Sequence, residues 1–273
     1  LGDVIDTKAF ADVDSVPELQ ALATAAAAVI GGAGTGTAPT LAQLQALGIT
    51  GVTDANLAAI QAAIAATPDD GTGVDTLAEL QAVANAGATN AANAAAIAAA
   101  LSTIAAAAQA NNASNTNVPA SVFATAGVTG VDSTNVAAIQ SALNSAAVVG
   151  TSVDTLGEVQ AVVDSYLTIL DAADGTADAD LTLTAAQYQA MALPAINTAA
   201  KATLMNDVVE QADTTDVDTH AKLLELAGGV LAHFGRRIGQ GPGAGSRPGA
   251  PGRRAAVGGP PRRPRRRPGS RLR

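Results

Sequence analysis

The chain has 273 residues, with no Cys, no Trp, three Phe and two Tyr, and a formal net charge of −9. The absence of cysteine excludes disulfides and thiolate chemistry. Residues 1–235 hold all 24 acidic residues and the three Lys, a net charge of −21, whereas residues 236–273 hold all 12 Arg. Because residues 1–235 have no basic patch, we expect no nucleic-acid binding by this part.

Residues 1–36 are predicted to contain the end of one helical repeat, followed by a linker. The first five residues resemble residues 205–209, near the end of a predicted helix, so we expect the chain to begin inside a repeat. A helix is predicted from Ser15 to about Ile30, because Ser15 is followed three residues later by Glu and so opens a capping box.

A Gly-rich run over residues 31–37 follows that helix. Phosphate-binding loops are also rich in glycine, but they follow a strand and keep the spacing G-x-G-x-x-G. Here the third glycine of that spacing is replaced by Thr37. We therefore predict a linker and no phosphate site.

Residues 37–117 are the most regular part and are predicted to contain a three-helix bundle. Thr40 is placed to cap the first helix, and Gly48 is placed to end it. The second helix is predicted to begin near Asp54, and the third after a capping box that starts at Thr76. Apolar side chains recur at helical spacing in all three: Leu41, Leu44, Leu47, Leu57, Ile60, Ile64, Leu77, Leu80 and Val83.

The end of this region, residues 84–117, is rich in Ala and Asn and is interpreted as an insertion. No charged residue occurs from residue 80 to residue 131, so a membrane span must be weighed. Large apolar residues are few here, and alanine contributes little to membrane insertion. We predict an additional Ala-rich helix over about residues 91–110 and no membrane span.

Two patterns of the bundle recur along the chain. The motif that begins Val-Asp-Thr-Leu at residue 74 has counterparts at residues 13, 153 and 217. The turn Gly-Ile-Thr-Gly-Val at residue 48 returns as Gly-Val-Thr-Gly-Val at residue 127. These copies predict an all-α protein of tandem three-helix bundles, in irregular repeats of about 60–80 residues.

We expect a second repeat with an acidic linker over residues 118–180 and a degenerate third repeat over residues 181–235. In the third repeat Ala192 replaces the capping glycine, Pro194 replaces the turn threonine, and Lys222 replaces the capping-box glutamate. Because these replacements remove helix-ending and capping groups, we expect the third repeat to be the least stable.

The acidic linker provides the one candidate metal site in the sequence, a weak Ca²⁺ candidate. Four carboxylates fall within ten residues: Asp171, Asp174, Asp178 and Asp180. Calcium prefers such oxygen ligands, but the spacing is not that of an EF-hand and Thr182 replaces its final glutamate. A solvated acidic linker is the interpretation that we favour.

The sequence contains no constellation that indicates catalysis. His220 and His233 are the only histidines, and they have no Cys or helical partner with which to bind a metal. No residue pattern points to a nucleophile and its base. We therefore predict no enzymatic activity and no cofactor.

Residues 236–273 differ from everything before them, because they consist mainly of Arg, Gly and Pro. Such a segment cannot bury a core, so we expect disorder. One hypothesis is an arm that binds a polyanion. The hypothesis that we favour is translation of GC-rich DNA in a shifted reading frame, because the change in composition is abrupt.

The residues Leu44-Gln-Ala-Leu-Gly-Ile-Thr, the Asn56-Leu-Ala-Ala-Ile helix and the Val74-Asp-Thr-Leu-Ala-Glu-Leu segment together resemble the GA-like repeats of large bacterial surface proteins and adhesins. These are similar in plan to albumin-binding GA modules, which are three-helix bundles. The resemblance covers about residues 1–234. It implies an extracellular or bacterial cell-surface location and a stalk or adhesive role. It does not imply albumin binding, because the surface from Asp54 to Thr67 is mostly Ala.

The function that we predict is a non-catalytic structural spacer. The alternative is a module that binds a host or matrix protein, which would need an exposed apolar patch shared by the repeats. Phe123 and Tyr188 are the candidates, but both align with Leu44 and are therefore predicted to lie in the core. Polyanion binding through the Arg-rich tail is a third and less favoured hypothesis.

Overall fold

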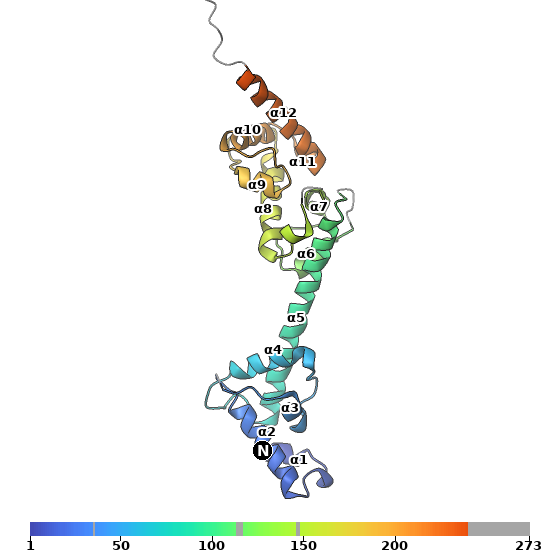
Figure 1. Cartoon of the computed structure of the whole chain (residues 1–273), viewed down its shortest axis with the longest axis vertical. Coiled ribbons are helices and arrows are strands. Elements are labelled where there is room, and N and C mark those ends of the chain that lie inside the picture. Colours follow the sequence, from blue (N-terminus) through green and yellow to red (C-terminus); the bar gives the residue numbers. More distant parts are fainter. Residues whose placement is uncertain (35, 113–116, 146–147, 240–273) are drawn as a thin grey trace, which may run out of the picture. The chain divides into compact units, whose positions relative to one another are not determined.

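The computed structural model describes residues 1–239, apart from residue 35, residues 113–116 and residues 146–147. Within these residues the chain is all α-helix and 3₁₀-helix with connecting turns, and its one isolated β-bridge joins Asp174 to Asp213 (Figure 1). The prediction of an all-α protein is confirmed. By its internal contacts the chain divides into residues 1–231 and a second unit that begins at Ala232.

The first elements are α1 (Gly2–Asp6), the 3₁₀-helix η1 (Phe10–Asp12) and α2 (Val16–Ile30). The predicted capping box of α2 is confirmed, because the Ser15 amide donates to Glu18 Oε2 at 3.1 Å. The second half of α2 buries one face, made of Leu22, Ala25 and Val29.

We refer to residues 37–117, 118–180 and 181–235 as segments A, B and C. Segment A contains α3 (Leu41–Ala46), α4 (Asp54–Ala65) and α5 (Leu77–Gln109). Thr40 and Thr76 cap their helices as predicted, whereas the N-cap of α4 is the residue before Asp54. The predicted apolar positions supply its core: Leu44, Leu47, Ile60, Ile64 and Leu80.

Helix α5 joins two predicted helices into one helix of 33 residues. We expected the third helix of segment A and the Ala-rich helix to be separate. They are continuous because Ala favours helix and no Pro interrupts the stretch. Gly87 lies within α5 without breaking it. It packs so closely against α4 that an added Cβ would lie 2.6 Å from Ile60 Cα. The first half of α5 packs along α4, and its second half packs against α6 and η2.

Segment B contains α6 (Ala120–Thr125), α7 (Val136–Leu143), the 3₁₀-helix η2 (Gly150–Ser152) and α8 (Leu156–Ala172). Its core side chains are Phe123, Ile139, Leu143, Val159, Val163, Tyr166 and Ile169. Phe123 is therefore a packing residue, as its alignment with a core leucine predicts.

Segment C contains α9 (Ala185–Ala190), α10 (Ala199–Glu210), α11 (Thr214–Val217) and the start of α12 (His220–Gly239). Its core side chains are Tyr188, Met191, Leu193, Ile196, Met205, Val209 and Leu223. The predicted tail from residue 236 onward begins inside the last turn of α12, and residues 240–273 lie outside the described residues.

The turn after the first helix has the same geometry in all three segments. Its first residue has a positive φ, +87° at Gly48, +87° at Gly127 and +64° at Ala192. In each case the next amide donates back to the buried residue of the preceding helix, at 3.1, 2.9 and 2.9 Å. This is the hydrogen bond that closes a helix on a left-handed residue.

A glutamine on the third helix holds that turn in segments A and B. Gln81 Oε1 accepts from the Thr50 amide at 3.0 Å, and Gln160 Oε1 accepts from the Thr129 amide at 2.9 Å. Each glutamine also donates through Nε2 to the carbonyl oxygen of the same threonine. We call this two-way contact the turn clamp.

A second side-chain amide ties the second helix to the start of the first in all three segments. Gln61 Nε2 donates to Pro39 O at 2.8 Å, and Gln140 Nε2 donates to Val118 O at 2.7 Å. In segment C, Asn206 Nδ2 donates to Leu183 O at 3.1 Å. We call this contact the start clamp.

One described helix, α5, is long and apolar enough to cross a membrane, with a mean hydropathy of 1.6 over its most apolar 18 residues. This rests on length and composition alone and is weak evidence. The prediction that the chain has no membrane span stays a prediction.

Candidate functional site

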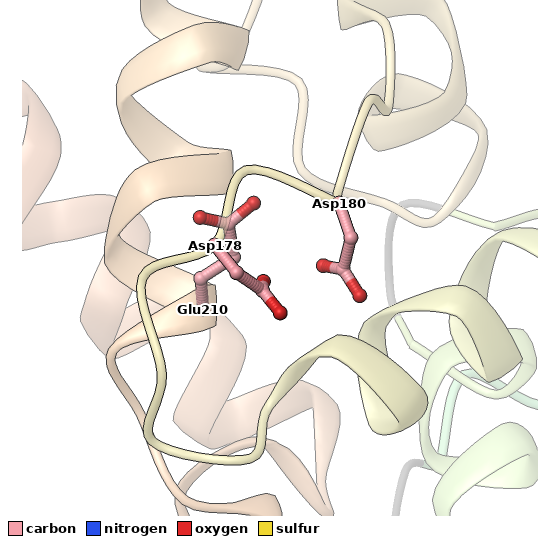
Figure 2. Close-up of side chains that lie close together, drawn as sticks. All are labelled: Asp178, Asp180 and Glu210. Carbon is pink, nitrogen blue, oxygen red and sulfur yellow. The ribbon is translucent and has the colours of Figure 1, made fainter.

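The predicted acidic linker brings two of its four carboxylates together with a third from another element. Asp178 and Asp180 lie in the loop before α9, and Glu210 lies at the end of α10 (Figure 2). One carboxylate oxygen from each residue lies within 4.8 Å of the other two. Among the described residues this is the only group of three or more potential metal ligands.

The other two predicted ligands lie elsewhere. Asp174 Oδ1 accepts hydrogen bonds from both the amide and the hydroxyl of Thr176, and these bonds lower the pKa of Asp174. Asp171 lines a groove of about 660 Å³ that α8 and α11 border, together with Thr134 and Asp218. The predicted set of four is therefore divided among three local environments.

Electrostatic repulsion is the main property of the carboxylate cluster. Partial desolvation raises the pKa of Asp180, and the neighbouring charges of Asp178 and Glu210 raise it further. Like charges at this distance favour either protonation of one group or binding of a cation. Oxygen-only ligands suit a hard divalent cation such as Ca²⁺.

Glu210 performs a structural task within this cluster. Its side chain is only 3% exposed, and its two oxygens accept from the amides of Ala179 and Leu181 at 3.1 and 2.9 Å. These bonds anchor the loop on α10 and satisfy the buried carboxylate. Glu210 therefore fastens the acidic loop to the helix.

Sequence reasoning missed Glu210, because it lies 30 residues from Asp180 along the chain. One signal was available: Asn206 and Glu210 are four residues apart, so both fall on the same helix face. Both are buried, at 8% and 3% exposure. Polar residues at that spacing beside an apolar stripe indicate a buried polar contact.

A groove of about 640 Å³ lies beside the cluster, between the loop, α9 and α10. Leu181, Leu183 and Ala202 supply apolar walls, and Asn206 and Glu210 supply polar groups. The groove is also lined by Thr182, Thr184, Thr203 and Asp207. The two buried polar side chains are already engaged: Asn206 accepts from Tyr188 Oη at 2.6 Å, and Glu210 holds the loop. The groove therefore offers a ligand mainly apolar contacts.

His220 lies in a third polar environment, at the start of α12. Its ring Nε2 lies 3.2 Å from Ala192 O, and its backbone amide donates to Ser141 Oγ at 2.8 Å. Burial lowers the pKa of this histidine, which favours the neutral ring. The serine hydroxyl donates to Ala138 O at 2.6 Å within α7, so the bond from the His220 amide to this hydroxyl joins the start of α12 to α7.

The Gly-rich run also contributes a backbone contact. Gly34 has a φ of +67°, and its amide donates to Thr67 O at 3.0 Å. This amide is therefore used within the chain.

Comparisons of the chain with protein families, with curated proteins and with solved structures find no match. The resemblance to GA-like repeats stays a prediction.

Proposed function

We propose that segments A, B and C are tandem three-helix units and that the chain serves as a non-catalytic structural spacer in a bacterial cell-surface or secreted repeat protein. The observation that carries this proposal is the recurrence of the turn clamp at an identical separation of 31 residues in segments A and B. Identical long-range contacts at matching positions indicate copies of one folding unit.

The start clamp supports the same proposal. It joins residues 22 apart in segments A and B and 23 apart in segment C. The capping box of the third helix recurs as well, at Thr76 with Glu79 and at Thr155 with Glu158. The recurring polar side chains thus hold helices and turns in place, which is what a scaffold requires.

The described side chains that could take part in a reaction also support a structural role. The ring of His220, the hydroxyl of Ser141, which accepts from the His220 amide, and the carboxylate of Glu210 each make contacts that join elements of the fold. A general base or nucleophile needs instead to face a substrate. The location at the cell surface is proposed on the resemblance of the repeats alone.

The alternative, a module that binds a host or matrix protein, has less support. Its candidate contact residues Phe123 and Tyr188 are 1% and 0% exposed. Large exposed apolar residues occur singly at different positions of the segments, such as Leu156 in segment B and Leu224 in segment C. A patch shared by the copies is what this alternative needs.

Small-angle scattering tests the spacer proposal. Residues 1–235 and the full chain would be measured over a dilution series, so that association is separated from size. A single compact domain of this length has a radius of gyration of about 17–18 Å. A spacer of consecutive units should give a clearly larger value for residues 1–235. A radius near the compact value at all concentrations would contradict the proposal.

A further inference from the structure

The first two turns of α2 match the third helices of segments A, B and C in sequence. Their apolar side chains, however, are more exposed than those of the third helices. Leu19 aligns with core residues of the three segments, which are 3%, 0% and 0% exposed: Leu80, Val159 and Leu223. Leu19 itself is 38% exposed, and Val16, one turn earlier, is 78% exposed. The second half of α2 is buried normally, so the exposure is confined to its start.

In segments A and B the second short helix packs on the matching third helix, and the first short helix packs on the long helix before it. Helix α4 packs along the start of α5 in segment A, and α7 packs against α8 in segment B. Leu156, the counterpart of Val16, is 42% exposed, whereas the counterparts of Leu19 are buried. The turn between the two short helices of each pair is fastened by the turn clamp. An uncovered start of α2 therefore lacks both the apolar cover and the turn.

Gln20 indicates which kind of turn would bind at the start of α2. It aligns with Gln81 and Gln160, the two glutamines of the turn clamp. Within the described residues the exposed side-chain amide of Gln20 has no hydrogen-bond partner. Its backbone carbonyl accepts from Thr24 Oγ1, a side-chain contact that threonine makes within helices.

Segment C lacks both the clamp glutamine and the turn amide that it would bind. Its turn has Pro194, which has no amide hydrogen to donate, and the position of the clamp glutamine is occupied by Leu224. The glutamine is therefore present where the turn has a threonine amide and absent where it does not. Its presence at Gln20 indicates a partner turn with a free amide.

We propose that Val16, Leu19 and Gln20 form a docking surface for a helix–turn–helix pair of the α3–α4 type, whose turn has the sequence Gly-(Ile/Val)-Thr-Gly. The second helix of the pair would bury Leu19, as its counterparts Leu80 and Val159 are buried. The side-chain amide of Gln20 would accept from the threonine amide and donate to the threonine carbonyl, as Gln81 does at 3.0 and 3.3 Å. This inference rests on the proposed repeat, and it adds the surface and its partner.

A tethered partner tests the docking surface. Residues 37–67, which contain α3, the turn and α4, would be fused ahead of Leu1 of the full chain through a Gly/Ser linker of about 12 residues. Such a linker spans about 20 Å on average and raises the local concentration of the pair to the millimolar range. NMR would follow the side-chain NH₂ resonances of Gln20 and the amide exchange of residues 19–23.

The expected result is a shift of the Gln20 NH₂ resonances and about tenfold slower exchange of the amides in residues 19–23, relative to the unfused chain. Two variants of the fusion serve as matched controls. Gln20→Ala removes the clamp without adding apolar surface, and Thr50→Pro in the fused copy alone removes the donor. Each should lose about fivefold of the protection, the effect of one hydrogen bond.

Three results would overturn the proposal. The fusion could leave residues 19–23 unchanged, or Gln20→Ala could keep all of the protection, which would show apolar contact without recognition. Protection could also arise in the unfused chain as its concentration rises, which would assign the surface to a second copy of the chain.

The parallel variant Gln81→Ala in the unfused chain separates this inference from the proposed function. If Gln81→Ala increases amide exchange at the turn of segment A while the fusion gives no protection, the repeat stands and the docking surface fails. If Gln81→Ala has no effect and scattering reports one compact domain, the proposed function itself fails.

Discussion

Segments A and C share the geometry of one turn but stabilise it with different chemistry. Segment A uses Gly48 at the left-handed position and an exposed contact between Gln81 and Thr50. Segment C has Ala192 at the same position, and the ring of His220 lies 3.2 Å from its carbonyl oxygen. The polar contact has moved from the surface into the interior.

The start clamp shows the same difference in burial between segments A and C. In segment A, Gln61 reaches the Pro39 carbonyl from a partly exposed position. In segment C, buried Asn206 both donates to Leu183 O and accepts from the hydroxyl of Tyr188. Buried polar contacts cost more to break than exposed ones, because a separated donor or acceptor stays away from water. Segment C can therefore contain individually strong polar contacts, although its sequence departs most from the repeat.

The largest effect is expected from Gly87→Ala, where α4 packs closely on α5 in segment A. The new methyl group would lie 2.6 Å from Ile60 Cα, so α4 must move away from α5. Overpacking of this kind costs about 2–3 kcal/mol. Urea unfolding followed by circular dichroism would measure the loss.

Gly157→Ala is the matched control for that variant, because it changes a helical glycine of α8 whose added Cβ meets no atom within 4 Å. It should leave the fold intact and stabilise by up to about 1 kcal/mol through helix propensity. Equal destabilisation by the two variants would refute the steric explanation.

Tyr188→Phe probes the buried polar contact of segment C. The variant removes the hydroxyl that donates to Asn206 Oδ1 at 2.6 Å and leaves that oxygen buried. We expect a loss of about 1–2 kcal/mol. Amide exchange should increase first in α9 and α10, and an increase confined to segment A would show that the contact is not local.

Ala192→Gly restores the residue that segments A and B use at the turn. An L-residue in the left-handed region costs about 1 kcal/mol, so glycine should stabilise segment C by about 0.5–1 kcal/mol. Differential scanning calorimetry would detect the higher melting temperature. Gly48→Ala should destabilise segment A by a similar amount, and a gain there would contradict the geometric argument.

The smallest effect is expected from a change of pH, which should act on segment C through His220. Near neutral pH the ring of His220 is already neutral. Burial lowers the pKa of His220, so the folded state binds a proton less readily than the unfolded state. Stability should therefore fall as pH decreases through about 6.5, the ordinary pKa of histidine. Comparing urea unfolding at about pH 7 and about pH 5.5 with that of His220→Gln would measure this, and an identical pH dependence in the variant would assign the effect to other groups.

Much of the local structure could be predicted from particular residues. The capping boxes at Ser15 and Thr76 place two helix starts correctly. The buried Phe123 and Tyr188 follow from their alignment with Leu44. These features depend on residues within one or two helical turns, which is why a sequence pattern can predict them.

The candidate site could be predicted only in part. Asp178 and Asp180 are among the carboxylates expected from the acidic run, but Asp171 and Asp174 lie apart from them. Glu210 joins the cluster because α10 brings it beneath the loop. A pattern along the chain does not contain that distance, since it depends on how α9 and α10 pack.

Helix starts, helix ends at glycine and the burial of apolar side chains could be read from the residues alone, because these depend on capping, backbone conformation and helical period. Other features depend on tertiary packing. Packing required glycine at residue 87 and brought Gln81 to Thr50 across 31 residues. These depend on how closely two helices approach, which is set by packing between residues distant in the chain.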